Sequence, residues 1–280
     1  MQDFKGRAAV ITGAASGIGL GIAHALAARG VDLAVCDIEK TALDAAVLSL
    51  RQHGVKVHPM IVDVSDRQQV YAAADEVVDQ FGRLDIAVNN AGVCFNAMPL
   101  HEMPDEMIDW SIGVNVMGVL NGIKAFVPRI IAGGAGGHVV NTSSIGGFQV
   151  RKNPLWHQGL YAATKYAVTA LSEGLRCDLE DLGIGVTVLA PSAVATNIGT
   201  SDRNRPDRFG GATTGAQADF VDKTLKEHGI SPDAVGEQVM RAIESNALYL
   251  FTHAEALPIL QERHRAIEAA VERVRDQLEA

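Results

Sequence analysis

The sequence predicts an α/β protein built around a parallel β-sheet of about seven strands. Apolar runs of strand length alternate with longer segments of helical period from the first residues to about Phe251, which is the pattern of successive β-α-β units. Glycine gathers where the apolar runs end rather than in a low-complexity stretch. The regular spacing leaves no linker, so we expect a single domain over residues 1–280, with an extra helix after the last strand.

The strands are expected as short apolar runs, because strands of a parallel sheet are buried on both faces. They fall near residues 7–12, 32–37, 56–62, 84–89, 137–142, 185–190 and 247–251. The helices are expected between them, where several segments open at Asp or Ser and close at Gly. They fall near residues 17–29, 40–53, 66–81, 103–132, 161–182 and 231–245.

Three segments depart from this alternation. Residues 148–159 and 197–229 read as loops, and the second is rich in Arg and Asp. Loops longer than about 12–15 residues in a compact domain are usually lids or binding loops. We therefore expect residues 197–229 to cover a ligand, with a disordered excursion as the alternative. Residues 254–280 carry apolar side chains at helical spacing, so we expect a C-terminal helix that packs on the body or on a neighbouring subunit.

Composition and motif content exclude several classes of protein. The chain has 24 Lys and Arg against 33 Asp and Glu, a net charge of −9 without any block of like charge, which argues against nucleic acid as a partner. Cys36, Cys94 and Cys177 lie far apart, a pattern that suits a reducing cytoplasm better than a disulfide framework. We find no signal-peptide core, no apolar run near the roughly 20 residues that span a membrane, and no metal-ligand motif.

A glycine-rich turn lies where the first strand gives way to the first helix. Residues 12–19 read Thr-Gly-Ala-Ala-Ser-Gly-Ile-Gly. Glycines allow backbone N–H groups to approach phosphate oxygens, and the helix N-terminus favours negative charge. The turn therefore predicts a pyrophosphate site; a turn needed only for packing of the helix on the sheet is the alternative. The cofactor-binding residues expected here are Gly13, Ser16, Gly17, Ile18 and Gly19.

Acidic and amide side chains follow the next three expected strands. Asp37 ends the second strand, 18 residues past Gly19, where a carboxylate accepts hydrogen bonds from an adenosine ribose and repels a 2′-phosphate. Because no Arg or Lys lies at positions 15, 16 or 38 to receive such a phosphate, NAD is favoured over NADP; a helix N-cap is the alternative role for Asp37. At the same sheet edge we expect cofactor contacts from Ile38, Asp63, Val64, Asn90, Ala91 and Gly92.

A phenol and an ammonium group lie four residues apart in the sequence Tyr161-Ala-Ala-Thr-Lys165. This spacing places both on one face of a helix. A free tyrosine has a pKa near 10, too high for a general base at neutral pH, and a fixed cation is expected to lower it. Ser143 and Ser144 end the fifth strand, where a hydroxyl can bind a substrate oxygen, and strand parity decides which one faces inward. Asn115 by itself reads as a buried polar residue satisfied by backbone.

Taken together and in order, these motifs resemble the short-chain dehydrogenase/reductase family, over about residues 5–251. The resemblance implies a doubly wound, seven-stranded parallel Rossmann sheet with helices on both faces. It also implies roles: Tyr161 as acid and base, Lys165 holding the nicotinamide ribose and tuning Tyr161, Ser144 polarising the substrate oxygen, and Asn115 anchoring a proton-relay water. By the same resemblance Asp63 and Val64 meet the adenine, Asn90 lies by the ribose, and Val194 and Thr196 contact the carboxamide.

Two features depart from the family pattern. The family usually has Pro-Gly where this chain has Pro191-Ser192, beside the expected nicotinamide position. The interval from Ser144 to Tyr161 is also a few residues longer than is common, which inserts Trp156 and His157 at the substrate mouth. These two side chains either line the substrate pocket or pack a surface loop.

The function expected from the resemblance is NAD-dependent hydride transfer that interconverts a secondary alcohol and a ketone, on a bulky aryl or alicyclic substrate. A 3-oxoacyl thioester or ketone reductase is the alternative enzyme, and a cofactor-binding regulator without turnover is the alternative outside enzymes. The expected helices 103–132 and 161–182 commonly pair between subunits in the family, which implies a homodimer or homotetramer.

Overall fold

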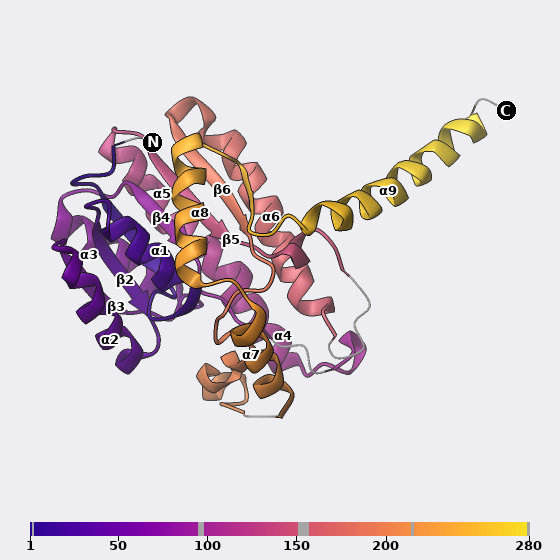
Figure 1. Cartoon of the computed structure of the whole chain (residues 1–280), viewed down its shortest axis with the longest axis horizontal. Coiled ribbons are helices and arrows are strands. Elements are labelled where there is room, and N and C mark those ends of the chain that lie inside the picture. The colour runs from indigo at the N-terminus through magenta and orange to yellow at the C-terminus, as the bar shows by residue number, and fades with distance from the viewer. Residues whose placement is uncertain (2, 95–97, 151–156, 214–215, 279–280) are drawn as a thin grey trace.

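In a computed structural model of the chain, seven parallel strands form one sheet in the order β3-β2-β1-β4-β5-β6-β7 (Figure 1). The structure describes residues 1, 3–94, 98–150, 157–213 and 216–278. The strands are β1 (Ala8–Thr12), β2 (Asp32–Asp37), β3 (Val57–Ile61), β4 (Ile86–Asn89), β5 (Gly137–Thr142), β6 (Ile184–Ala190) and β7 (Tyr249–Phe251). The helices are α1 (Gly17–Ala27), α2 (Lys40–Leu50), α3 (Arg67–Phe81), α4 (Asp105–Ile112), α5 (Gly118–Gly133), α6 (Gly159–Leu179), α7 (Ala216–His228), α8 (Pro232–Ser245) and α9 (Ala256–Leu278). The predicted parallel sheet is confirmed.

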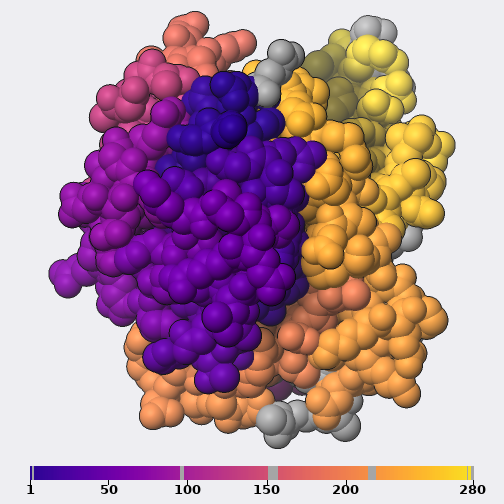
Figure 2. Space-filling view, turned by 60° about the vertical axis from the view of Figure 1, so that its left-hand side comes forward, coloured from indigo at the N-terminus to yellow at the C-terminus, as the bar shows by residue number. Residues whose placement is uncertain are grey.

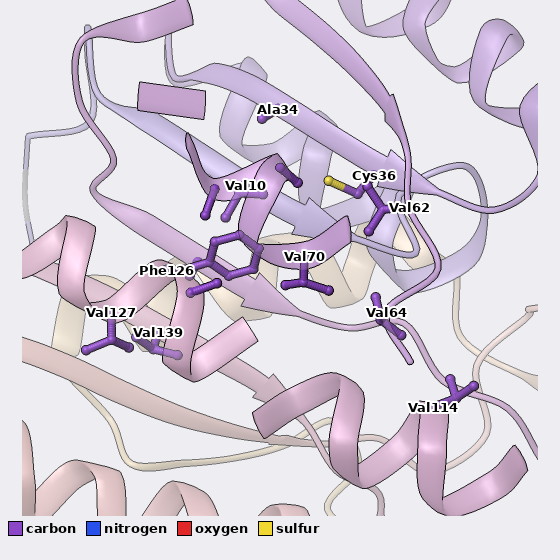
Figure 3. Close-up of a cluster of buried hydrophobic side chains, with 14 of the residues drawn as sticks. Val10, Ala34, Cys36, Val62, Val64, Val70, Val114, Phe126, Val127 and Val139 are labelled. Carbon is purple, nitrogen blue, oxygen red and sulfur yellow. The ribbon is translucent and has the colours of Figure 1, made fainter. Parts of the chain in front are cut away.

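Alternating strand residues feed two separate hydrophobic cores, one on each face of the sheet. Val10 and Ala34 pack with Phe126 and with α3, α4, α5 and α6 on one face (Figure 3). Ala9 and Leu33 pack with α1, α2 and α8 on the other. Because successive side chains of a strand point to opposite faces, burying both faces requires the nearly continuous apolar strands seen in the sequence.

The chain reverses its winding direction between β1 and β4, which lie side by side although three helices and two strands separate them in sequence. β1 and its neighbours β2 and β3 run to one edge of the sheet, and β4 to β7 run to the other. In sheets of this kind the crevice at the carboxyl ends of the two central strands is the usual ligand site. The fold therefore places the expected site at Thr12 and Asn89.

Helix α8, near the end of the chain, packs closely on α1, near its beginning (Figure 2). A Cβ atom on Gly21 would lie 2.2 Å from the Pro232 carbonyl oxygen, and one on Gly236 would lie 2.3 Å from the Gly21 carbonyl oxygen. Only glycine at both positions allows the two backbones to approach this closely. The contact fixes the position of α1, whose N-terminus faces the site.

Two expected elements differ from the structure. The single helix expected over residues 103–132 is α4, one π-helical turn (Gly113–Met117) and α5; periodicity alone does not reveal an extra residue in one turn. The loop expected over residues 197–229 contains two 3₁₀ turns (Ile198–Asn204 and Asp207–Phe209) and α7. Adjacent glycines and a polar composition concealed the helical period of α7, which begins beyond Gly210 and Gly211.

The C-terminal helix forms as expected, but most of it does not pack on the body. α9 runs outward from the end of β7 (Figure 1), and its contact with α6 includes Arg263 over the ring of Tyr166. Beyond that point Val271 is 65% and Leu278 is 83% exposed. Of the two packing modes expected for this helix, packing along the body is therefore wrong for its outer half.

By length and composition alone, among the described residues the helical stretch Asp105–Gly133 could cross a membrane. Trp110, Phe126 and Ile130 of this stretch are among the most deeply buried side chains of the fold, whereas Ile112 and Ile131 are exposed. The buried face of this stretch therefore has the composition expected of a core helix.

Candidate active site

A cavity of about 230 Å³ lies at the carboxyl edge of the sheet, across the point where the winding reverses. Of the residues singled out from the sequence, those that line it are Gly13, Ser16, Gly17, Ile18, Asp37, Ile38, Asp63, Val64, Asn90, Ala91, Gly92, Ser144, Tyr161, Val194 and Thr196. Gly19, Asn115 and Lys165 lie behind this lining. The structure thus brings the expected cofactor and catalytic residues to one site.

The glycine-rich turn presents the N-terminus of α1 to the cavity. Gly17 has a φ of +53°, which favours glycine, and it opens the helix directly against Thr196. Ser16 is the N-cap residue, but its side chain makes no capping hydrogen bond. The first N–H groups of α1 are therefore not capped by that side chain, and they suit an anion such as a pyrophosphate. Gly19 serves packing instead, since a Cβ atom there would lie 2.1 Å from the Gly13 carbonyl oxygen.

The Asp37 carboxylate is held in place by two backbone N–H donors. Ala15 donates at 2.9 Å and Glu39 donates at 3.0 Å. Burial raises the pKa of Asp37, and these two hydrogen bonds oppose the rise. The N-cap position of α2 belongs to Glu39 rather than to Asp37. The carboxylate retains acceptor capacity toward the cavity, as a ribose diol requires.

Asn90 joins the glycine-rich turn to β5. Its Nδ2 donates to the carbonyl oxygens of Thr12 and Gly13 at 3.1 and 3.2 Å, and its Oδ1 accepts from Thr142 at 3.2 Å. The Asn90 side chain is therefore engaged by the protein, and it fixes the walls of the cavity on both sides of the β1–β4 junction.

Ser144, Tyr161 and Lys165 meet at the other end of the cavity. Ser144 and the Tyr161 phenol share a hydrogen bond, and the Lys165 Nζ lies 5.7 Å from the centre of the Tyr161 ring. Lys165 is buried and donates to the Thr142 carbonyl oxygen at 2.9 Å. Ser143 points the other way, into α6, where its hydroxyl donates to the Lys165 carbonyl oxygen at 2.9 Å. Because successive residues of an extended chain point to opposite sides, Ser144 faces the cavity and Ser143 does not.

Burial controls the protonation of this group. Desolvation raises the pKa of the Tyr161 phenol well above its usual value, the Cys94 thiol adds to the rise, and the hydrogen bond with Ser144 opposes it. The same desolvation lowers the pKa of Lys165 to about 8. Lost solvation therefore outweighs the favourable contacts of the phenolate in the protein by itself, and the expected lowering of the Tyr161 pKa by Lys165 stays a prediction.

Asn115 lies in the π-helical turn between α4 and α5, and it is buried. Its Oδ1 accepts from the Val93 N–H at 2.8 Å, and its Nδ2 donates to the Val93 carbonyl oxygen at 2.9 Å and to the Thr164 hydroxyl at 3.1 Å. The Asn115 side chain is therefore a buried polar group whose hydrogen bonds go largely to the backbone, as expected from the sequence. Turns of this type are frequent at functional sites, because they break the regular helical bonding at a chosen position.

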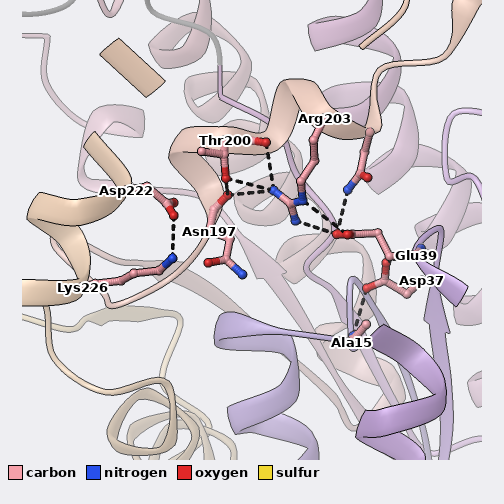
Figure 4. A network of polar contacts seen from close by, with 9 residues as sticks. Ala15, Asp37, Glu39, Asn197, Thr200, Arg203, Asp222 and Lys226 are labelled. Atoms are coloured by element: carbon pink, nitrogen blue, oxygen red, sulfur yellow. Dashed lines mark hydrogen bonds and ion pairs between the residues drawn. The ribbon is translucent and has the colours of Figure 1, made fainter. Parts of the chain in front are cut away.

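Several residues of the site were missed by sequence reasoning. Trp110 and Leu225 line the cavity, as do Glu39, Arg203 and Asn204, which form a polar network beside Asp37 (Figure 4). No Arg or Lys lies next to Asp37 in the sequence, but Arg203 reaches this part of the cavity by pairing with Glu39, 164 residues away. The richness of residues 197–229 in Arg and Asp was the one available signal.

The two departures from the family pattern differ in their relation to the cavity. Trp156 lies outside the described residues, and the His157 side chain is exposed. Ser192 lines the cavity and its N–H donates to the Thr252 hydroxyl at 3.2 Å, so the residue that replaces the usual glycine is accommodated at the cavity wall.

A doubly wound sheet with an open helix N-terminus, a carboxylate at the end of β2 and a Ser-Tyr-Lys group defines a nicotinamide-dependent oxidoreductase site. A sequence model described as short chain dehydrogenase matches residues 7–207. The chain belongs to the short-chain dehydrogenase/reductase family.

Individual relatives agree with this assignment. A C alpha-dehydrogenase of Sphingobium sp. strain SYK-6 is 36% identical over 95% of this chain and 87% of that protein. A 1-deoxy-11-beta-hydroxypentalenate dehydrogenase of Streptomyces exfoliatus is 33% identical over 89% of this chain and 84% of that protein. Among solved structures, a short-chain dehydrogenase/reductase of Burkholderia phymatum in complex with NAD has a TM-score of 0.89 and 33% identity, over 96% of this chain and 97% of that one.

Proposed function

We propose that this protein is an NAD-dependent dehydrogenase that interconverts a secondary alcohol and a ketone on a bulky aryl or alicyclic substrate. The observation that carries the proposal is one cavity lined both by Asp37, at the end of β2, and by Ser144 and Tyr161, which follow β5 in the chain, with Lys165 beside Tyr161. The names of the Streptomyces relative, a dehydrogenase of a hydroxylated pentalenate, and of the NAD complex support the substrate class and the cofactor.

The residues present suit the dinucleotide. The open N-terminus of α1 would hold the pyrophosphate, Asp37 the adenosine ribose, Asp63 and Val64 the adenine, and Val194 and Thr196 the carboxamide. Asn90, Ala91 and Gly92 form the wall beside it, and Lys165 would hold the nicotinamide ribose. When bound, the cofactor supplies the hydride acceptor at the end of the cavity beside Tyr161.

In the oxidative direction the hydroxyl of the substrate gives up its proton while the carbinol carbon gives up a hydride. Tyr161 takes the proton at its phenolic oxygen, and Ser144 donates a hydrogen bond to the same substrate oxygen, which stabilises the negative charge that develops there. The high pKa of Tyr161 means that the phenolate forms only with nearby positive charge, which Lys165 provides. Asn115 anchors the π-helical turn beside Lys165, from which a water can relay the proton onward.

The first test is a screen of NAD and NADP against aliphatic, alicyclic, aryl and steroid secondary alcohols, read from the near-ultraviolet absorbance of the reduced cofactor. We expect reduction of NAD with ring-bearing alcohols, and loss of turnover with retained NADH binding in Tyr161→Phe. Turnover of Tyr161→Phe at the wild-type rate would contradict the mechanism. Activity confined to 3-oxoacyl thioesters would favour the alternative reductase, and NADH binding without turnover on any substrate would favour a regulator.

We further propose that the protein works as a homodimer or homotetramer in a reducing cytoplasm. The exposed apolar stripe of α9, formed by Ile267, Val271, Val274 and Leu278, supports self-association, and the absence of a disulfide among the described cysteines supports the compartment. Light scattering after gel filtration should give a multiple of 29.6 kDa. Val271→Asp should lower that mass, whereas a monomeric wild-type chain would contradict the proposal.

A further inference from the structure

One continuous stretch of chain, residues 194–208, follows the cavity, and its residues up to Pro206 contribute to the lining. Thr196 lies against Gly17 at the N-terminus of α1. Arg203 and Asn204 bind Glu39, whose N–H binds Asp37. We infer that this stretch is a strap, fastened over the adenosine half of the cofactor pocket by two arginine–carboxylate ion pairs that must open when the dinucleotide enters or leaves. The inference rests on the proposed function, because it takes the cavity to be the dinucleotide site.

The first ion pair joins Arg203 to Glu39. The Arg203 Nη2 donates to Oε1 at 2.6 Å and the Nε to Oε2 at 3.3 Å, while the Asn204 Nδ2 adds a hydrogen bond to Oε1 at 2.8 Å (Figure 4). Partial burial raises the pKa of Glu39, but the bonds from Arg203 and Asn204 lower it overall, so the carboxylate is charged. Because the Glu39 N–H also binds Asp37, this ion pair lies directly beside the expected ribose position.

Arg203 is also fixed within the strap itself. Its Nη1 donates to the carbonyl oxygens of Asn197 at 3.1 Å and Thr200 at 2.9 Å, across the 3₁₀ turn Ile198–Asn204. The guanidinium is therefore held in one orientation before it meets Glu39, which reduces the entropy lost in forming the pair. With a further bond from Nη1 to the Thr200 hydroxyl, at 3.2 Å, Arg203 makes five acceptor contacts. These leave little of the guanidinium available to a 2′-phosphate, in keeping with the proposed preference for NAD.

The second ion pair joins Arg208 to Asp63, the residue expected beside the adenine. The Arg208 Nη2 donates to the Asp63 Oδ2 at 2.7 Å and to the Ser65 hydroxyl at 2.9 Å. The Arg208 side chain is 54% exposed, against 33% for Arg203. Solvent therefore screens the second pair more, and we expect it to contribute less.

The middle of the strap is held near the catalytic group. The Ser201 hydroxyl accepts from the Cys94 N–H at 2.9 Å and donates to the Cys94 carbonyl oxygen at 3.1 Å. Helix α7 packs on the same turn. Release of the adenosine end therefore allows the strap to swing about a point that remains attached, which exposes the nucleotide and retains the substrate end.

The test measures release of NADH directly, by rapid mixing of the NADH complex with excess NAD and detection of energy transfer from tryptophan; Trp110 lines the cavity. Arg203→Gln should speed release roughly tenfold and Arg208→Gln about threefold, and Arg203→Lys should recover part of the loss. Added salt should speed release from the wild-type protein and have little effect on the double variant. Arg29→Gln is the matched control, because Arg29, just beyond the C-terminal end of α1, makes a similar two-pronged pair with Glu237 of α8, at 3.0 and 2.9 Å.

The outcomes separate the strap from the proposed function. Release from Arg203→Gln and Arg208→Gln at the rate of Arg29→Gln, with unchanged melting curves, would overturn the strap while leaving the oxidoreductase intact. Failure of the wild-type protein to bind either NADH or NADPH would overturn the proposed function, and the strap with it. Should Arg203→Gln unfold, Glu39→Gln removes the same pair from the other side and must give the same faster release.

Discussion

Replacing Lys165 by methionine should stabilise the folded protein at neutral pH while abolishing its activity. Burial lowers the pKa of Lys165 from its usual 10.5 to about 8, which corresponds to a cost of about 3 kcal/mol in the free energy of folding at pH 7. Methionine has a similar length and no charge. It loses the hydrogen bond to the Thr142 carbonyl oxygen, at 2.9 Å, which contributes about 1 kcal/mol.

The free energy of unfolding at pH 7 should therefore increase by about 2 kcal/mol in Lys165→Met. For a chain of 280 residues, this corresponds to a rise of about 3 °C in the melting temperature. The difference in stability between Lys165→Met and the wild-type protein depends on pH. In the unfolded chain Lys165 keeps its proton up to its usual pKa, whereas in the folded protein it loses the proton from about pH 8 upward. The stability of the wild-type protein therefore rises with pH through this window, and the advantage of Lys165→Met should shrink to near zero by about pH 10.

Thermal unfolding followed by circular dichroism, at fixed protein concentration and at several pH values, measures this difference. Lys40→Met is the control, since the Lys40 side chain is 74% exposed and its replacement should shift the melting temperature little at any pH. A lower melting temperature for Lys165→Met at pH 7, or a gain that is the same at pH 7 and pH 10, would refute the reasoning.

Three further changes test other parts of the site and the fold. Asn115→Ala leaves the buried N–H and carbonyl of Val93 unpaired, so it should lower the unfolding free energy by about 2–4 kcal/mol in chemical denaturation and impair turnover. Asp37→Ser should raise the ratio of NADP to NAD efficiency about tenfold in steady-state kinetics. Asp85→Asn weakens the ion pair with Arg83, at 2.6 Å, and should lower the free energy of unfolding by about 2 kcal/mol at neutral pH. The pKa of Asp85 is lowered in the folded protein despite burial. The difference in stability from wild type should therefore vanish in acid, where the wild-type carboxyl is protonated.

Local chemistry made the sheet and most of the site predictable from the sequence. Asp37 and Asn90 end strands, and the carboxyl ends of parallel strands meet at one edge, so their positions follow from the order of the elements. Gly17 follows from the φ that the turn requires, and the spacing of Tyr161 and Lys165 follows from the helical repeat. These inferences need only short-range rules and the topology.

The rest depends on contacts between distant parts of the chain, or on solvation. The pairing of Arg203 with Glu39 joins positions 164 residues apart, and no local pattern in either segment indicates it. The direction of the Tyr161 pKa depends on how completely the three-dimensional fold removes water, which spacing along a helix does not report. The π-helical turn at Asn115 differs from a regular helix by one residue, less than the resolution of a periodicity argument.

The packing of α8 on α1 orders events during synthesis of the chain. The glycine-rich turn and α1 leave the ribosome early, but Ile22 and Leu26 of α1 belong to the core that α8 completes, and Gly21 and Gly236 bring the two backbones together only after residue 236 has been made. Until then this side of α1 lacks one of its main packing partners. Because the packing of α8 on α1 closes a long loop, it should be slower than the formation of local structure in the N-terminal half. A nascent chain halted before Ser231 therefore carries an exposed apolar helix, and chaperone binding to such halted chains should end once α8 has emerged.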